Sequence, residues 1–266
     1  MIDRGKRSVV GVLVDAVDYE AALSRIVDAA RRRRSYTVSA LAVHGVMTGV
    51  QSTAHKFRLN SFDLIVPDGQ PVRWALNAIH SMRLPDRVFG TQLALRTLEI
   101  AASEGLPVYF YGTTRRILAK LVLSLQQRYS TLTVAGAEPS KFRTLDMNER
   151  SALAERIRKS GAAITFVGLG CPRQEVFVYE MKGLLPMPVL AVGAAFAFIA
   201  GELAQAPAFM QRNGLEWLFR LGQEPRRLWR RYLLLNPYYL FLLAGQILGM
   251  HYSTEGRKPT REVGYG

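Results

Sequence analysis

Short apolar runs alternate with segments of helical periodicity along most of the chain. The apolar runs predict β-strands at Val9–Leu13, Tyr36–Leu41, Leu64–Val66, Val108–Tyr111, Leu132–Ala135, Ala163–Val167 and Val189–Val192. Between them, apolar residues at helical spacing predict helices, for example at Tyr19–Arg33, Thr91–Glu104, Thr114–Arg128 and Asn148–Ser160. Strands that alternate with helices favour an α/β fold, with a mostly parallel sheet flanked by helices on both faces.

Polar residues directly follow several of the predicted strands. In a sheet of this kind, ligands bind in the crevice beyond the carboxyl ends of the strands. These polar residues are therefore the first candidates for a site. They are Asp68, Gly112-Thr113-Thr114, Glu138-Pro139-Ser140 and the turn from Gly168 to Glu175.

The turn from Gly168 to Glu175 carries the most specific of these signals. Gly168 and Gly170 let a ligand approach the backbone closely, and Pro172 stands at the predicted first position of the next helix, where no N–H is needed. The free N–H groups of a helix start bind anions such as phosphate. We expect Gln174 and Glu175 at the mouth of the same site, so the segment predicts a nucleotide or phosphate site.

Several other chemistries are excluded by what the sequence lacks. Arg173 stands where a dinucleotide fingerprint needs its third glycine, and there is neither a P-loop nor a Gly-x-Ser-x-Gly motif. The single cysteine, Cys171, excludes an internal disulfide framework and fits a reducing compartment. The scattered histidines give no metal-ligand spacing, so we expect neither a zinc site nor a cofactor. His44 is either a ligand or base of the site or a structural histidine.

Asp68 directly follows a buried strand, in the turn Pro67-Asp68-Gly69. Turn chemistry alone favours these residue types. An aspartate at the carboxyl edge of a sheet can equally act as general base on a substrate hydroxyl. The nearby Arg73 and Arg87 either hold phosphate oxygens or lie on the surface.

The chain is strongly basic, with 35 Lys and Arg against 21 Asp and Glu and a net charge of +14. This excess predicts a polyanionic partner, which is nucleic acid, an anionic membrane or a phosphorylated substrate. The run from Arg31 to Arg34 ends a predicted helix, where cations are favourable, and is best explained as a solvated helix end. No secretory signal precedes the first predicted strand, so we expect a cytoplasmic location.

The composition changes from Ala206-Pro207 onward, which divides the chain into a predicted core of residues 1–205 and a helical appendage of residues 206–266. Four arginines share one arc of a helical wheel, opposite an apolar and aromatic arc: Arg226, Arg227, Arg230 and Arg231. Three residues interrupt the apolar run that follows, from Tyr232 to Met250: Asn236, Pro237 and Gln246. This pattern favours a helix lying on an anionic membrane over one crossing it. The alternative is a helix pair packed on the core, with exposed arginines.

Five stretches appear in an order that is informative when they are taken together. They are Pro67-Asp68-Gly69, Arg87-Val88-Phe89-Gly90-Thr91, residues 167–175, residues 192–196 with Ala200-Gly201, and residues 214–221 with Glu224-Pro225-Arg226-Arg227. In this order they resemble the WecG/TagA/CpsF family of bacterial glycosyltransferases. The resemblance covers nearly the whole chain. The stretches Gly-Leu-Gly-x-Pro-x-Gln-Glu and Gly-Leu-Glu-Trp-Leu-x-Arg-Leu are specific when found together.

The resemblance implies an inverting enzyme that moves a sugar from a UDP-sugar to a polyprenyl-pyrophosphate-linked saccharide at the cytoplasmic membrane face, without an obvious bound metal. The sugar is typically N-acetylmannosamine, its uronic acid or glucose. The implied fold is a Rossmann-like core with a C-terminal appendage that reaches the membrane and helps to close the active site. By the same resemblance, Asp68 is the base, Gln174 lies near the donor, and arginines of the appendage face the pyrophosphates.

The predicted site has Asp68 as its catalytic residue and no metal. The residues expected to bind substrate are Ser39, His44, Gly69, Arg87, Gly112, Thr113, Glu138, Ser140, Gly168, Gly170, Pro172, Gln174, Glu175, Arg220, Arg226, Arg227 and Arg230. We expect the donor diphosphate near the turn that begins at Gly168, with arginine in the role that a metal serves elsewhere, because no Asp-x-Asp pair is present.

The sequence also departs from the family pattern. Many members carry Thr-x-Asn after the second strand, where this chain has no asparagine at the matching place. Substitution of the asparagine by Ser39 or by His44 predicts a different donor sugar. Gln92 replaces an aspartate common in the family. Ala197 and Gln205 replace an acid and a base, which is consistent with the loss of one ion pair.

Two other functions remain as alternatives at this point. The net charge fits a nucleic-acid-binding protein, whose affinity would fall steeply with salt. The arginines adjoin an apolar tail, however, which favours the membrane and no nucleic acid. A catalytically inactive membrane scaffold of the same fold is the second alternative. Homo-oligomerisation is left open.

Overall fold

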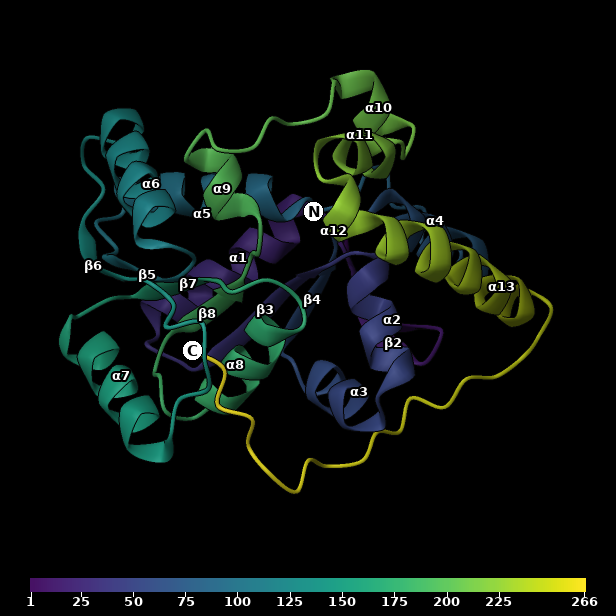
Figure 1. The fold of residues 1–266 in the computed structure, drawn as a ribbon, viewed down its shortest axis with the longest axis horizontal. Helices are drawn as coiled ribbons and strands as arrows, with labels where there is room; N and C mark the ends of the chain where they lie inside the picture. Colours follow the sequence, from purple (N-terminus) through teal and green to yellow (C-terminus); the bar gives the residue numbers. More distant parts are fainter.

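A single parallel sheet forms the centre of the molecule in the computed structural model, which describes residues 1–266 apart from the side chains of Arg227 and Arg231 (Figure 1). Its strands run in the order β4-β3-β8-β7-β5-β6, and every neighbouring pair is parallel. The strands are β3 (Tyr36–Leu41), β4 (Leu64–Pro67), β5 (Val108–Gly112), β6 (Val134–Glu138), β7 (Ile164–Gly168) and β8 (Pro188–Ala191). The α/β fold with a parallel sheet is therefore confirmed.

Both faces of the sheet are buried, because successive side chains of a strand point to opposite faces. Leu64 and Val66 of β4 belong to one hydrophobic cluster, whereas Ile65 between them belongs to another. This explains why the strands read as continuous apolar runs rather than as alternating patterns.

Helices cover each face of the sheet. On one face lie α1 (Tyr19–Arg31), α5 (Gly90–Ser103), α6 (Arg115–Arg128) and α9 (Ala195–Ile199). On the other lie α2 (Val43–Gln51), α3 (Thr53–Asn60), α4 (Gln70–His80), α7 (Met147–Lys159) and α8 (Arg173–Met181). The helices expected from periodicity are found within two residues of their predicted ends.

The first predicted strand was wrong. In place of one strand over Val9–Leu13, the chain forms an antiparallel hairpin of β1 (Asp3–Val9) and β2 (Val12–Val17). The two residues between the strands, Val10 and Gly11, both have positive φ, of 51° and 85°. A two-residue turn with positive φ at both positions matches the twist of a hairpin, but valine is an unusual residue there and gives no turn signal.

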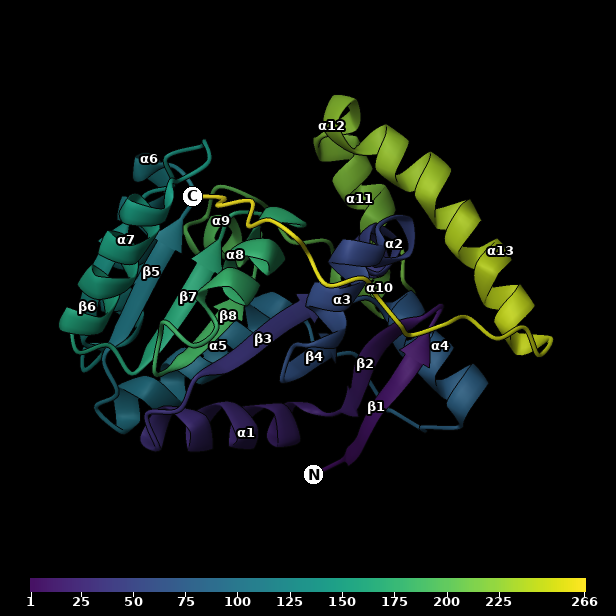
Figure 2. The ribbon, with the colours of Figure 1, turned by 90° about the horizontal axis from the view of Figure 1, so that it is seen from below.

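The C-terminal arm, residues 206–250, lies over the carboxyl ends of the strands (Figure 2). It contains α10 (Ala208–Arg212), α11 (Glu216–Gln223), α12 (Pro225–Arg230), a π-helical turn η1 (Arg231–Leu235) and α13 (Asn236–Ile247). Helix α13 packs on the core through Tyr239, whose hydroxyl donates to Pro71 O at 3.1 Å, and through Gln246. The Gln246 amide bonds the hairpin turn, with Val10 N–H donating to Oε1 and Nε2 donating to Ser8 O.

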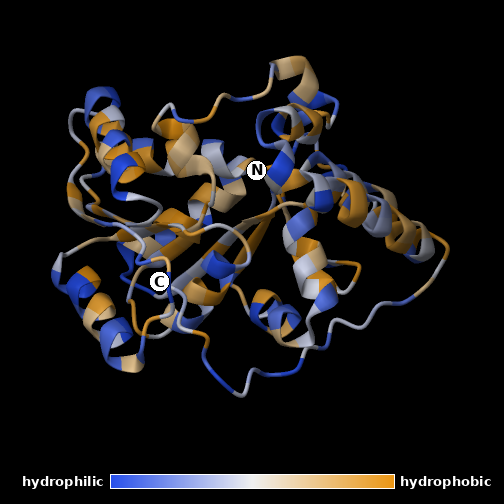
Figure 3. Cartoon of the chain, in the orientation of Figure 1, coloured by the Kyte–Doolittle hydropathy of each residue, from blue (hydrophilic) through white to orange (hydrophobic). Residues whose placement is uncertain are grey.

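The same helix carries hydrophobic residues along much of its length (Figure 3). Leu240 and Phe241 are 58% and 73% exposed. Among the described residues, no helix is both long enough and apolar enough to cross a membrane. Helix α13 thus packs on the core, as the alternative interpretation predicted, and its outer face leaves apolar side chains exposed.

Residues 251–266 follow α13 as an extended segment, which we call the strap. The strap runs along α3 and ends beside α8, close to the carboxyl ends of β5 and β7 (Figure 1). It has no regular helix or strand of its own.

Candidate functional site

A cavity of about 830 Å³ lies at the carboxyl ends of the strands. The chain leaves β3 toward α2 on one face of the sheet, whereas it leaves the neighbouring β8 toward α9 on the other face. Such a divergence opens a crevice between the two strand ends. The cavity lies at this place, and its roof is formed by residues of the C-terminal arm, among them Glu216, Arg220, Leu228, Arg230 and Leu234.

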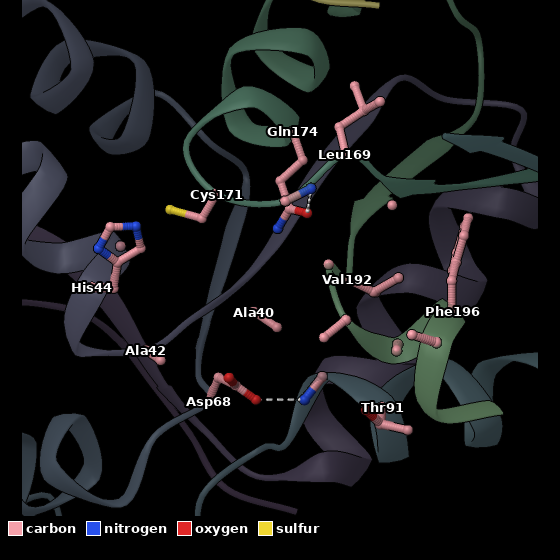
Figure 4. Close-up of a pocket in the computed structure, with 18 of the residues that line it drawn as sticks. Ala40, Ala42, His44, Asp68, Thr91, Leu169, Cys171, Gln174, Val192 and Phe196 are labelled. Atoms are coloured by element: carbon pink, nitrogen blue, oxygen red, sulfur yellow. Dashed lines mark hydrogen bonds between the residues drawn. The ribbon is translucent and has the colours of Figure 1, made fainter. Parts of the chain in front are cut away.

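Asp68 lies in the wall of the cavity at the end of β4 (Figure 4). Its Oδ1 accepts a hydrogen bond from Gly90 N–H at 2.6 Å. Burial raises the pKa of Asp68 to about 6, against the opposing effects of the Arg87 guanidinium and of the Gly90 N–H. A carboxylate whose pKa lies close to neutrality is well matched to accept a proton from a hydroxyl.

Arg87 connects this corner of the cavity to the C-terminal arm. Its Nη1 donates to the backbone oxygen of Asp68 at 3.2 Å, and its Nη2 donates to Glu216 Oε2 at 2.6 Å. The Arg87 and Glu216 side chains are only 9% and 16% exposed. Arg87 therefore lies behind Asp68, where it holds α11 against the core, and it is not itself in the cavity lining.

The turn from Gly168 to Glu175 forms the opposite wall of the cavity. Gly170 has a φ of 78° with open space beside its Cα, so the backbone is accessible to a ligand there. The Gln174 side chain closes the turn, because its Oε1 accepts from Gly170 N–H at 3.2 Å (Figure 4). Pro172 is the residue before α8 rather than its first residue, one position from the prediction, and it is not in the cavity lining.

The predicted position of Gln174 and Glu175 at the mouth of the site was wrong. The two residues are 3% and 0% exposed and lie at the base of the cavity. Glu175 Oε1 accepts from Gln174 Nε2 at 2.9 Å and from Ser39 Oγ at 3.1 Å. Burial raises the pKa of Glu175 despite these donors. Polar residues at a helix start are usually accessible. Here the hydrogen bonds of the two side chains to one another and to Ser39 offset part of the free-energy cost of burying them.

Ser39 and His44 have different positions. Ser39 is fully buried and turned toward Glu175, outside the cavity lining. His44, at the start of α2, lines the cavity on the same side as Asp68 (Figure 4). Only His44 of the two is placed to touch a ligand directly.

The predicted arginines of the arm also differ in their positions relative to the cavity. Arg220 and Arg230 line the cavity. The Arg220 guanidinium lies 5.7 Å from the centroid of the Phe198 ring. Arg226 is exposed and outside the lining, while the Arg227 side chain lies outside the part of the chain that the structure describes.

The remaining predicted residues follow β4, β5, β6 and β7. Gly69 precedes α4 and Gly112 packs against the backbone of Gly168; neither lines the cavity, although Gly168 does. Thr113 lines the cavity in a left-handed conformation, with φ 54°. Glu138 is instead engaged by Arg156, with both guanidinium contacts at 2.9 Å, away from the cavity.

Ser140 borders a second cavity of about 170 Å³, which shares Thr113, Phe142, Gly168 and Leu169 with the first.

Several residues that line the first cavity were not predicted from the sequence. Glu216 is the most important of them. It belongs to the stretch 214–221 of the family resemblance, and its negative charge close in sequence to the four predicted arginines of the arm is a signal that indicates an ion pair. Among the described side chains, no group of three or more His, Cys, Asp or Glu residues is arranged to hold a metal ion.

Comparison with known proteins identifies relatives over most of the chain. The family described as "Glycosyl transferase WecG/TagA/CpsF family" matches residues 7–252, so residues 253–266 lie beyond the matched range. An N-acetylglucosaminyldiphosphoundecaprenol N-acetyl-beta-D-mannosaminyltransferase of Bacillus spizizenii is 28% identical over 217 residues, which cover 80% of this chain and 82% of that protein. A protein of the same name from Bacillus subtilis is 28% identical over 186 residues, 70% of each chain.

Proposed function

The chain belongs to the WecG/TagA/CpsF family of glycosyl transferases, and from this premise we propose that it transfers N-acetylmannosamine from a UDP-sugar to N-acetylglucosamine on undecaprenyl diphosphate. The names of the two Bacillus relatives support this acceptor and this sugar. The product belongs to the assembly of a cell-envelope polysaccharide. The observation that carries the proposal is the position of Asp68, with its raised pKa, across one cavity from the Gly170 turn and from two arginines.

In the proposed reaction, Asp68 accepts the proton of the acceptor hydroxyl while the oxygen attacks the anomeric carbon of the donor. The C–O bond forms as the bond to the UDP oxygen breaks, and the configuration at the anomeric carbon inverts. Arg220 and Arg230 face the cavity from the arm, where they offset the negative charge that develops on the departing diphosphate. We propose that these arginines act without a metal ion.

The two departures at Ser39 and His44 have different consequences under this proposal. Ser39 orients Glu175 and hence Gln174, through the 3.1 Å bond to Glu175 Oε1. His44 is the residue that can contact a sugar, because its ring lies in the cavity wall. A donor preference different from that of the relatives would therefore depend on His44.

We further propose that the protein acts at the cytoplasmic face of the bacterial inner membrane as a peripheral protein. The outer face of α13 exposes Leu240, Phe241 and Ile247, Leu248 directly after it is also exposed, and α12 carries the exposed Arg226 and Arg230. Apolar side chains beside cations are typical of a helix that lies in the headgroup region of an anionic bilayer. Binding there would bring the cavity roof close to a lipid-linked acceptor.

A UDP-release assay tests the proposed reaction. The purified protein is incubated with UDP-N-acetylmannosamine, its uronic acid or UDP-glucose, each with and without a short-chain polyprenyl-diphosphate N-acetylglucosamine. We expect UDP release that depends on the acceptor when UDP-N-acetylmannosamine is the donor, together with transfer of the sugar to the lipid-linked acceptor. Absence of release with every donor would favour the inactive scaffold. Tight, salt-sensitive binding to DNA or RNA together with no release would favour the nucleic-acid alternative.

A further inference from the structure

The strap is held to the core at its start and at its end. At its start, Asn60 Nδ2 donates to Thr254 O at 2.7 Å, and Arg257 N–H donates to Thr53 O at 3.1 Å, so the strap is tied to α3. These contacts join segments that are far apart in the sequence. They fix the direction in which the chain runs after α13.

The end of the strap is held more firmly. The N–H groups of Val263 and Gly264 both donate to the buried Glu180 carboxylate, at 2.6 and 2.9 Å. Leu145 N–H donates to Gly264 O at 2.5 Å, and Thr144 forms an antiparallel bridge with the next strap residue, Tyr265. Hydrogen bonds to a buried carboxylate are strong, so this end is fixed in position.

Two glycines show that the strap sequence fits this path. A Cβ at Gly256 would lie 2.4 Å from the Phe57 backbone nitrogen, and a Cβ at Gly264 would lie 2.3 Å from Leu145 O. Both clashes are with backbone atoms, which cannot move aside as a flexible side chain can. Glycine is therefore required at both contacts, and the docked path is specific to this sequence.

The strap places one aromatic ring at the second cavity. Tyr265 lines this cavity, and the Arg173 guanidinium lies 5.6 Å from the centroid of its ring. Phe142 borders the same cavity, with its side chain 59% exposed. The volume of about 170 Å³ equals the liquid volume of about five or six waters, which is enough for one heterocyclic ring. Two aromatic side chains and an arginine around such a space are suited to a nucleobase.

The second cavity also lies in the correct order along the sheet edge for the far end of a sugar nucleotide. Asp68 follows β4, the turn at Gly168 follows β7, and the second cavity lies at the ends of β7, β5 and β6. Three strand spacings separate β4 from β7, which is about 14 Å. Along the sheet edge the order is thus general base, diphosphate turn, then second cavity. A sugar nucleotide has the order sugar, diphosphate, nucleoside.

We propose that the strap forms one wall of the donor nucleoside subsite, and that the Tyr265 ring stacks on the uracil base. This inference rests on the proposed function and adds to it a specificity residue from a part of the chain that lies beyond the family match. The role belongs to the ring and not to the hydroxyl, so phenylalanine can replace the tyrosine. Removing the ring weakens nucleotide binding without weakening binding of the diphosphate alone.

Calorimetric titration of the full chain with UDP and with inorganic pyrophosphate tests the proposal. The variants are Tyr265→Ala, Tyr265→Phe and the matched control Tyr252→Ala, a strap tyrosine that lies outside both cavity linings. We expect Tyr265→Ala to raise the Kd for UDP about tenfold, which corresponds to the stacking of one base. Its Kd for pyrophosphate stays within twofold of wild type, and Tyr265→Phe and Tyr252→Ala bind UDP as wild type does.

Equal UDP affinity in wild type and Tyr265→Ala would overturn the strap proposal and leave the proposed function intact. Parallel weakening of UDP and pyrophosphate in Tyr265→Ala would also overturn it, because the effect would then be a general distortion. Failure of the wild-type protein to bind UDP would overturn the proposed function together with the strap proposal. The KM for the UDP-sugar should rise in Tyr265→Ala while the KM for the acceptor is unchanged.

Discussion

The substitution Asp68→Asn separates the two explanations for the Pro67-Asp68-Gly69 turn. Asparagine keeps the shape of the side chain and the oxygen that accepts from Gly90 N–H, at 2.6 Å in the wild type, and it is also a good turn residue. It cannot accept a proton from a substrate hydroxyl. If Asp68 is the general base, activity is lost while the fold is kept.

The expected loss in kcat is between about a hundredfold and ten-thousandfold, which is the usual contribution of a general base. The effect on stability has the opposite sign. Burial raises the pKa of Asp68 from 3.8 in the unfolded chain to about 6 in the folded protein. The folded state thus binds the proton more tightly, and stability from this group is present below about pH 4 and is lost as the pH rises through 6. Above that pH the charged side chain costs about 3 kcal/mol, a cost that asparagine removes.

Two measurements on the same protein samples check this prediction. UDP release is measured with donor and acceptor, and thermal unfolding is followed at pH 8 and at pH 4. We expect Asp68→Asn to unfold at a higher temperature than wild type at pH 8 and at the same temperature at pH 4. In the wild type, kcat/KM should fall below about pH 6, where the base becomes protonated.

Asp63 provides a matched control, because it lies just before the opposite end of the same strand, where its carboxylate accepts from the Thr37 N–H and hydroxyl, each at 2.8 Å. These hydrogen bonds lower the pKa of Asp63 although burial opposes them, so the side chain stabilises the fold at neutral pH. Asp63→Asn should lower the melting temperature and keep turnover. Turnover at the wild-type level in Asp68→Asn would refute the role of Asp68 as base, and it would leave the turn chemistry that asparagine preserves as the explanation for this residue.

Three further predictions concern the arm and the base of the cavity. Replacing both Leu240 and Phe241, 58% and 73% exposed, by serine should reduce flotation with anionic liposomes about tenfold or more, whereas Leu123→Ser, also 58% exposed but on α6, should have no effect. Glu175→Gln should be more thermostable than wild type at pH 8, with the difference closing at pH 4, because burial raises the pKa of this carboxyl; an equal difference at both pH values would contradict the assignment. Glu216→Gln should make the arm more sensitive to limited proteolysis, since it removes the charged partner that the buried Arg87 guanidinium meets at 2.6 Å, at a cost of about 3 kcal/mol; unchanged cleavage would show that the ion pair does not hold α11.

Most of the fold could be predicted because its strands are buried on both faces and therefore read as unbroken apolar runs. The hairpin at the start of the chain could not, since its turn uses Val10 with φ 51° in place of the usual Asn or Gly. The strap could not be predicted either. Its position depends on backbone hydrogen bonds to Glu180 and on close contacts at glycines, which leave no periodic pattern in the sequence.

Part of the site could likewise be predicted from the sequence, and part could not. Asp68 and Gly170 were predictable, because turns at the carboxyl ends of parallel strands must share one edge of the sheet. The partners of Arg87 and Gln174 could not be predicted. The partner of Arg87 lies far along the chain, and the position of Gln174 depends on how deeply the helix start is buried. Arg87 thus pairs with Glu216, and Gln174 lies on a buried carboxylate rather than at the mouth.

We propose that the large cavity at the strand ends transfers a sugar from a UDP-sugar to a lipid-linked acceptor. The most direct test is mass spectrometry of the lipid product after incubation with UDP-N-acetylmannosamine and polyprenyl-diphosphate N-acetylglucosamine, with Asp68→Asn in parallel. We expect a product heavier by one N-acetylhexosamine residue for the wild type and almost none for the variant. An unmodified acceptor with the wild-type protein, or equal product with both, would contradict it.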